Sequence, residues 1–164
     1  SSMLYVSVGT GISCALVLDG QLWAGHRGEA IALGELPVDR WVDADSTATL
    51  EGFASGGGIT DRYGQGLGAR EVLARAATGD ARASDIVDSA AAALGAGLAW
   101  AVSLVDPEMI VLGGGLGSSG GRWLEQVRKR YERLVRPGAP ALNVAELGAD
   151  SGVIGAALAA REAG

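Results

Sequence analysis

The chain has 164 residues, of which 48% are hydrophobic and 20% are charged, and its formal net charge is −6. These values predict one soluble globular domain with a substantial core, and the acidic balance argues against a surface that binds nucleic acid. No apolar run reaches the roughly 18–20 residues of a membrane span, and the first residues lack a basic leader, so we expect no membrane segment and a cytoplasmic protein. The single cysteine, Cys14, excludes an internal disulfide and is expected to be a buried structural thiol.

Residues 3–24 are expected to form two or three strands. Apolar and β-branched residues lead into the turn Gly9-Thr10-Gly11, a second apolar run follows at 15–18, and Asp19-Gly20 then predicts a two-residue hairpin. Asp-Gly between two such runs is a strong hairpin signal because both central residues must tolerate a positive φ.

The turn Gly9-Thr10-Gly11 has two interpretations. Its glycines would let an anion approach the backbone N–H groups while Thr10 adds a hydroxyl donor, which makes the turn a candidate phosphate cradle. Alternatively, the glycines only shape a tight bend between strands, because short glycine-rich turns are common. The turn alone leaves both interpretations open.

Residues 25–49 lose periodicity and are expected to form a long connection, a feature that is often functional in compact domains. Residues 50–63 are expected to form one helix with Thr49 as its N-cap. The run Gly56-Gly57-Gly58 is unfavourable inside a helix, so it indicates either close helix packing or a backbone that approaches another group.

The second half of the chain alternates helices with strands. Apolar residues at helical spacing predict a long helix over 81–105, which Asp106-Pro107 ends. This pattern predicts one α/β domain over residues 1–164, with a hairpin-rich start and a sheet that is parallel in its later part. The expected elements after residue 64 are helices over 69–77, 81–105, 123–135 and 151–161 and strands over 109–112 and 143–147.

A second glycine turn, Gly113-Gly114-Gly115, follows the strand over 109–112 and stands before a helix. Nucleotide sites form at such places in α/β sheets because glycine lets a ligand touch the backbone. The turn is not a Rossmann fingerprint, and a Walker A motif is absent because the only lysine is Lys129. As a pair, the two turns are similar to those of the actin-like ATPase fold, where one turn meets phosphates and the other lies beside adenosine.

Several short motifs follow one another along nearly all 164 residues: Gly9-Thr10-Gly11-Ile12, Leu18-Asp19-Gly20, Leu50-Glu51 with Ala54-Ser55-Gly56, Gly79-Asp80, Asp106-Pro107, Ile110-Val111-Leu112-Gly113-Gly114-Gly115, and Gly148 with Gly155-Ala156. In this order and spacing they resemble the C-terminal part of a ROK family protein, the group of bacterial sugar kinases and sugar-responsive repressors. No single motif decides the resemblance.

The resemblance implies an actin-like ATPase (ribonuclease H-like) domain with a nucleotide site. It implies that Gly9, Thr10 and Gly11 contact the phosphates of ATP with Mg²⁺, and that Gly114 and Gly115 flank the adenosine. Glu51 matches a carboxylate that contacts the sugar in these kinases.

The acceptor segment departs from the family pattern. ROK kinases usually carry Gly-Glu-[Ile/Leu]-Gly-His, in which the Glu and His hold sugar hydroxyls, whereas here Ala32 stands at the Glu position and Glu35 at the His position. Glu35 can accept hydrogen bonds from hydroxyls in place of the imidazole, so we expect an altered sugar specificity. The loop over 39–49 lacks the Cys and His residues of the family's structural zinc site, so we expect no zinc.

The resemblance places the family's first phosphate motif and its catalytic Asp before the first residue of this chain. We therefore expect the nucleotide- and sugar-binding C-terminal half of an ATP-dependent sugar kinase, without a catalytic residue of its own and inactive in isolation. The alternatives are the sugar-sensing domain of a ROK-type regulator or pseudokinase, and a structural or oligomerisation domain. The expected partners are a sugar, the N-terminal domain and, because half of a cleft exposes apolar surface, a second copy in a dimer.

Overall fold

The computed structural model describes residues 1–38 and 48–148. Its centre is a five-stranded sheet in the order β3-β2-β1-β4-β5. The strands are β1 (Ser2–Val8), β2 (Ile12–Leu18), β3 (Gln21–Trp23), β4 (Met109–Gly113) and β5 (Leu142–Val144). The helices are η1 (Leu33–Glu35), α1 (Leu50–Ala54), α2 (Gly56–Tyr63), α3 (Ala69–Ala77), α4 (Ala81–Val105), α5 (Gly114–Gly117) and α6 (Gly121–Glu132).

The sheet is mixed, as the order of elements predicts. β1 pairs antiparallel with β2 and β2 with β3, whereas β4 runs parallel to both β1 and β5. The predicted hairpin is confirmed: Asp19 and Gly20 have φ values of 49° and 80°, which is the double positive φ of a tight primed turn. β1 and β4 therefore end side by side, and both glycine turns leave the same edge of the sheet.

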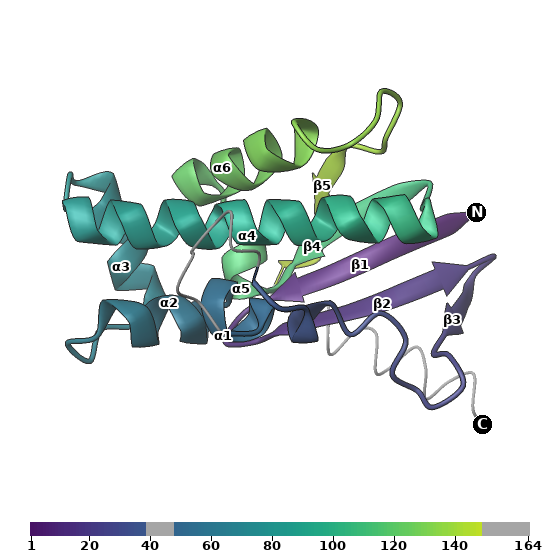
Figure 1. The fold of residues 1–164 in the computed structure, drawn as a ribbon, viewed down its shortest axis with the longest axis horizontal. Helices are drawn as coiled ribbons and strands as arrows, with labels where there is room; N and C mark the ends of the chain where they lie inside the picture. Colours follow the sequence, from purple (N-terminus) through teal and green to yellow (C-terminus); the bar gives the residue numbers. More distant parts are fainter. Residues whose placement is uncertain (39–47, 149–164) are drawn as a thin grey trace.

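Helix α4 is the central helix of the core and has the predicted bounds. It crosses one face of the sheet with α6 beside it, while α1, α2 and α3 gather at one end (Figure 1). A Cβ added to Gly95 would lie 2.6 Å from the carbonyl oxygen of Val127, so glycine allows α4 and α6 to approach closely. α4 is long and apolar enough to cross a membrane by length and composition, but 72% of its most apolar window is buried inside the domain, as in the core helix of a globular protein.

The single helix predicted over 50–63 is wrong, because α1 and α2 are separated at Ser55. Ser55 is extended (φ −72°, ψ 170°), and its hydroxyl accepts from the Gly58 N–H at 3.1 Å as the N-cap of α2. Thr49 caps α1 as predicted, with its hydroxyl 3.2 Å from the Gly52 nitrogen. Continuing the helix through Ser55 would forgo this cap, which satisfies an otherwise unpaired N–H at a buried helix start.

α3 also has its predicted bounds, 69–77, whereas three other elements differ from prediction at their ends. α6 covers 121–132 rather than 123–135, β5 covers 142–144 rather than 143–147, and β4 extends through Gly113, so that this glycine belongs to the strand. The predicted helix over 151–161 lies outside the described residues. Hydrogen bonds set boundaries of this kind, and a hydrophobic pattern resolves them only to a few residues.

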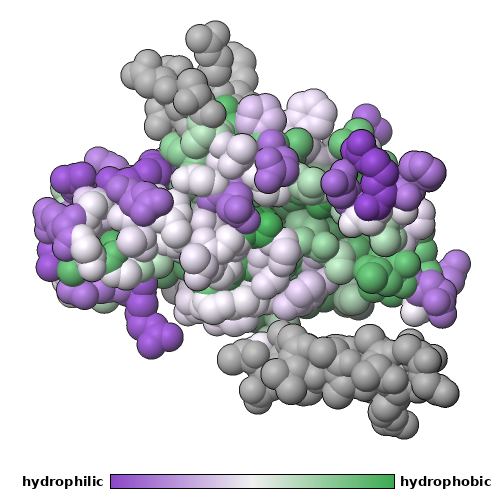
Figure 2. Space-filling view, turned by 90° about the horizontal axis from the view of Figure 1, so that it is seen from below, coloured by the Kyte–Doolittle hydropathy of each residue, from purple (hydrophilic) through white to green (hydrophobic). Residues whose placement is uncertain are grey.

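Arg62 joins three helices at the α2–α3 end of the domain. Its guanidinium donates to the carbonyl oxygens of Phe53 and Ile86 and to the Ser89 hydroxyl, at 3.2, 3.4 and 2.6 Å. It also stacks 3.6 Å from the centroid of the Phe53 ring. Mostly hydrophilic surface covers this end of the molecule, whereas hydrophobic surface shows over the middle and, beside hydrophilic side chains, at the opposite end (Figure 2).

Cys14 is half-buried on β2. Burial raises the pKa of its thiol to about 12, opposed in part by a hydrogen bond with the backbone of Leu33. The thiol is therefore protonated at neutral pH and is a poor nucleophile, in keeping with the structural role predicted for it.

Candidate functional site

The turn Gly9-Thr10-Gly11 is clamped by the start of α2. The Gly56 N–H donates to the Gly9 carbonyl oxygen at 2.7 Å, and the Gly57 N–H donates to that of Thr10 at 3.0 Å. A Cβ on Gly56 or Gly57 would lie only 2.7 or 2.8 Å from those oxygens. Gly56 and Gly57 are thus explained by a close approach of the turn's backbone, whereas a Cβ on Gly58 would meet the Gly52 carbonyl oxygen of α1, so both alternatives that the sequence left open apply.

Glu51 holds the other side of the same turn. Its side chain extends from the first turn of α1, and Oε2 accepts from the Ile12 N–H at 2.7 Å. A Cβ on Gly11 would lie 2.6 Å from this oxygen, so Gly11 leaves the room that the carboxylate occupies. Glu51 remains exposed to solvent, and a carboxylate has about four acceptor positions, so one backbone N–H leaves the others for a ligand.

The two glycines of the second turn have different surroundings. Gly114 has a φ of 79°, and a Cβ there would lie 2.5 Å from the carbonyl oxygen of Val8, so this residue packs against the end of β1. A Cβ on Gly115 would meet nothing within 4 Å. Gly114 thus shapes the junction of the two strands, and Gly115 faces open space.

Both turns open on one cavity of about 840 Å³. Of the predicted nucleotide contacts, Gly9, Thr10 and Gly115 line it, whereas Gly11 and Gly114 do not. The remaining wall comes from α2, α3, α5 and the start of α6, with one residue of α4 and the residues that flank these helices. It consists of Gly56, Gly57, Thr60, Gly68, Ala69, Arg70, Leu73, Ala74, Ala76, Ala77, Val87, Leu116, Ser119, Gly120, Gly121, Arg122 and Trp123.

Trp123 and Arg122 are cavity residues that the sequence reasoning missed. Trp123 is 1% exposed, and its Nε1 has no hydrogen-bond partner among the described residues. Arg122 is paired bidentately with Asp88, at 2.8 and 2.6 Å, which turns its charge toward α4. The only sequence signal for either residue is its place just after the second glycine turn, where the α6 start faces the cavity.

The predicted acceptor carboxylates Glu35 and Glu51 lie on neighbouring segments. A Cβ on Gly34, beside Glu35, would lie 3.0 Å from the Ile12 carbonyl oxygen and 3.3 Å from the Glu51 Cβ. The Leu50 N–H donates to the Leu36 carbonyl oxygen at 2.6 Å and fixes η1 against α1. Both carboxylates are exposed. The structure thus brings η1, the first glycine turn and the start of α1 to one point.

The sequence profile of the ROK family matches residues 1–163. The chain belongs to the ROK family. It is 37% identical over 158 residues to the bifunctional enzyme NanE/NanK of Brucella melitensis, a match that covers 94% of this chain and 30% of that protein.

Solved structures of ROK kinases share the fold. The ROK hexokinase from Thermus thermophilus matches with a TM-score of 0.83 and 33% identity, over 96% of this chain and 56% of that one. A ROK family glucokinase from Streptomyces griseus, in complex with glucose and AMPPNP, matches with a TM-score of 0.81 and 26% identity, over 98% and 61%. The actin-like ATPase fold and the relationship to sugar kinases are thus confirmed, and the chain spans about a third to three fifths of these relatives.

The predicted absence of zinc can be compared with the structure only in part. Among residues 1–38 and 48–148, no group of three or more His, Cys, Asp and Glu side chains is placed to hold a metal ion. The loop that would carry the zinc ligands, 39–49, lies mostly outside the described residues. The absence of zinc from this ROK protein stays a prediction.

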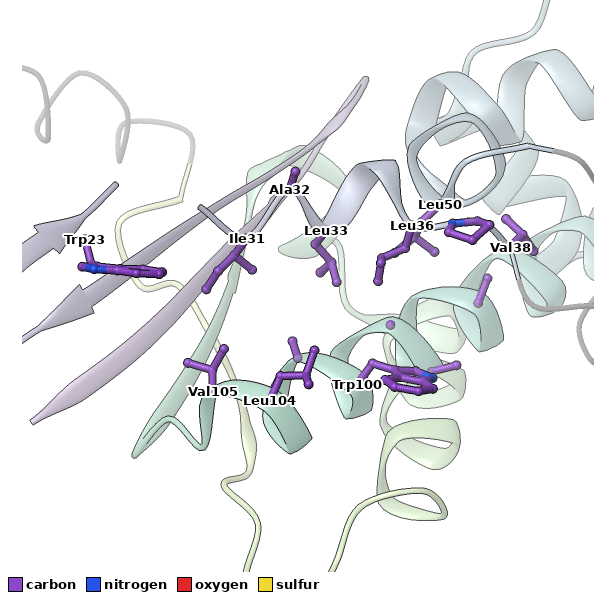
Figure 3. A pocket seen from close by; sticks show the side chains of 15 residues that line it. Trp23, Ile31, Ala32, Leu33, Leu36, Val38, Leu50, Trp100, Leu104 and Val105 are labelled. Carbon is purple, nitrogen blue, oxygen red and sulfur yellow. The ribbon is translucent and has the colours of Figure 1, made fainter. Parts of the chain in front are cut away.

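The ROK acceptor segment also borders an apolar groove of about 810 Å³. Side chains of the 31–38 segment face those of α4 across it (Figure 3). Ala32, which the resemblance aligns with a sugar-binding Glu, lines this groove. Trp100 and Leu104 on the α4 side are 62% and 77% exposed. The expected dimer stays a prediction.

Proposed function

We propose that the chain is the C-terminal, nucleotide- and sugar-binding domain of an ATP-dependent ROK sugar kinase. The observation that carries the proposal is the single cavity on which Gly9, Thr10 and Gly115 open, with Glu51 bonded to the same turn. Ligands of open α/β sheets bind outside the carboxyl ends of the strands, which is where β1 and β4 deliver the two turns. A cytoplasmic location, where ATP is supplied, belongs to the same proposal.

The cavity fits a nucleoside triphosphate. Cβ atoms added to Gly9 and Gly115 would meet nothing within 4 Å, so a ligand can reach the backbone at both turns. Gly9, Thr10 and Gly115 would bind ATP with Mg²⁺, while Gly11 and Gly114 would act through the shape of the turns. The glucokinase bound to AMPPNP and glucose supports this assignment.

The acceptor is proposed to be a sugar that lies beside Glu51 and Glu35. Carboxylates accept strong hydrogen bonds from hydroxyl groups, and the two exposed side chains lie on adjoining segments. Because Ala32 lacks the carboxylate that ROK kinases have at its position, one sugar hydroxyl loses a partner. We therefore expect a hexose preference that differs from that of the glucokinase.

Phosphoryl transfer depends on positioning of both partners and on a base at the acceptor hydroxyl. This chain's residues would bind and orient the two substrates, and the base is proposed to lie in an N-terminal half that completes the cleft. The second candidate function is that of a sugar sensor in a ROK-type regulator or pseudokinase. Ala32 and Glu35 favour it, because they remove two sugar-contacting side chains of the kinase pattern.

The test is calorimetric titration of Mg²⁺-ATP, and separately of a panel of hexoses, into the chain and into a longer protein that contains it. Binding of both ligand types supports the kinase domain. Binding of a sugar alone points to the sensor, and binding of neither ligand would refute both functions. Thr10→Tyr, which places a large side chain at the cavity wall, is expected to abolish nucleotide binding without affecting sugar binding.

A further inference from the structure

Glu51 joins the two halves of the proposed site through one side chain. It comes from α1, 39 residues beyond Ile12 in the sequence, and its Oε2 is 2.7 Å from the Ile12 nitrogen. A Cβ on Gly11 would lie 2.6 Å from Oε2 and crowd this carboxylate, whereas one on Gly34 would make an ordinary contact with Oε2 at 3.7 Å. A carboxylate that only bound sugar would not need this room on the side of the phosphate turn.

The turn has few other restraints. The two N–H groups at the start of α2 hold the carbonyl oxygens of Gly9 and Thr10, and the Gly9 N–H bonds within the turn to the Gly11 carbonyl oxygen at 2.9 Å. In the described part of the chain, the N–H groups of Thr10 and Gly11 have no acceptor. Of these two residues only Thr10 lines the cavity, so its N–H is the donor available to an anion there, and the Ile12–Glu51 hydrogen bond orients the peptide that follows Gly11.

We propose that Glu51 is a positioning residue for the phosphate turn and couples the sugar to the nucleotide. This proposal rests on the proposed function. An exposed carboxylate samples several rotamers, and a sugar hydroxyl bound to it would favour the rotamer that also holds the Ile12 N–H. The sugar would then preorganise the turn for phosphates, and by linkage the nucleotide would raise sugar affinity by the same factor.

Three variants distinguish the effect of the Glu51 charge, the effect of its side-chain length, and the effect of shortening an exposed Glu elsewhere. Glu51→Asp keeps the charge but is one methylene shorter, so it loses the Ile12 N–H. Glu51→Gln keeps the length and an acceptor oxygen, so it retains that hydrogen bond. Glu132→Asp, the same shortening at an exposed position at the end of α6, is the matched control.

Two measurements test the proposal on the ligand-free and ligand-bound chain. Hydrogen exchange of the Ile12 amide should be at least about tenfold faster in Glu51→Asp and nearly unchanged in Glu51→Gln and Glu132→Asp. Mg²⁺-ATP affinity without sugar should fall several-fold in Glu51→Asp alone. A saturating hexose should raise Mg²⁺-ATP affinity about fivefold in the wild type and leave it unchanged in Glu51→Asp.

The outcomes distinguish the two proposals. Unchanged Ile12 exchange in Glu51→Asp, in a variant with wild-type circular dichroism and melting temperature, would overturn the positioning role. An equal loss of Mg²⁺-ATP affinity in Glu132→Asp would also overturn the proposal. The same holds if a saturating hexose does not change the Mg²⁺-ATP affinity of the wild type. If Ile12 exchange responds as expected but the wild type binds no nucleotide, the proposed function fails while Glu51 still holds the turn.

Discussion

Adjacent glycines in the second turn have separable roles, which the sequence alone treats as one motif. Gly114 has a positive φ and lies against Val8, whereas Gly115 has open space at its Cβ position and lines the cavity. Replacing the first glycine disturbs the backbone, and replacing the second changes the surface that a ligand meets. Loss of binding in a Gly114 variant is therefore no evidence for a nucleotide contact.

We predict that Gly115→Ala folds normally but binds Mg²⁺-ATP more weakly, because its methyl group enters the cavity. Gly114→Ala should lose about 2–4 kcal/mol of stability, because alanine is strained at a φ of 79° and its Cβ would lie 2.5 Å from the Val8 oxygen. Urea unfolding measures the stability and calorimetry the affinity. Equal destabilisation of the two variants would contradict the separation, and so would wild-type affinity in Gly115→Ala.

At the residue scale, short-range motifs predict only part of the site. Thr10 could be proposed from the local Gly-Thr-Gly pattern, and Glu51 from the resemblance to the ROK family. Trp123 could not, since its place in the cavity depends on how α6 packs against α4. The bond between Ile12 and Glu51 was also beyond the sequence, because it spans 39 residues and involves a backbone group that has no sequence signature.

At the scale of elements, hydrophobic periodicity predicted α4 with its correct bounds and failed at residues 50–63. α4 has a continuous apolar pattern, a capping residue (Asp80) and a Pro after its end, so all local signals agree. In 50–63 the decisive event is one residue, Ser55, whose hydroxyl caps a new helix rather than continuing the old one. The N–H groups of Gly56 and Gly57 are free to bind the first glycine turn because α2 begins there. A single helix over 50–63 could therefore not predict the role of these two glycines.

Asp80 links the stability of α2, α3 and α4 to pH. Its carboxylate accepts from the Ala83 N–H at 2.9 Å and from the Tyr63 hydroxyl at 2.8 Å. The hydrogen bond from the Ala83 N–H is the largest cause that lowers the pKa of Asp80, and the hydrogen bond from the Tyr63 hydroxyl is the second. A lowered folded-state pKa means that the stabilisation is present above the unfolded value, near pH 4, and is lost as the pH falls through the folded value.

We therefore predict that Asp80→Asn reduces the pH dependence of stability on the acid side. Asparagine still caps α4, but it has no charge to lose. In urea unfolding between pH 2.5 and 7, the wild type should be more stable than the variant above about pH 5, and the difference should shrink as the pH falls below about 4. If the free energies of unfolding of the two proteins change in parallel with pH over this range, Asp80 is not the source of the acid sensitivity.

At the scale of the molecule, the described residues share one hydrophobic core, and the chain spans only part of the ROK kinases that it matches. One hydrophobic cluster joins the sheet to α1, α2, α3, α4 and α6, yet the match covers only 56% of the hexokinase and 61% of the glucokinase. The cavity and Glu51 both adjoin the first glycine turn, at the end of β1. In the proposed function, folding and ligand binding therefore reside in this part, and the chemistry needs a second domain.

The isolated chain is predicted to bind its ligands without transferring a phosphoryl group between them. Of the two carboxylates in the proposed acceptor site, Glu51 accepts from the Ile12 N–H, and the resemblance aligns Glu35 with a sugar-binding His. We assign neither the role of base, so a coupled assay for ADP should show no hexose-dependent release from this chain. A longer protein that contains it should turn over at roughly 1–100 s⁻¹, the range typical of kinases. Hexose-dependent ADP release from the isolated chain would place the base within these 164 residues, and loss of that release in Glu35→Gln or Glu51→Gln would then identify it.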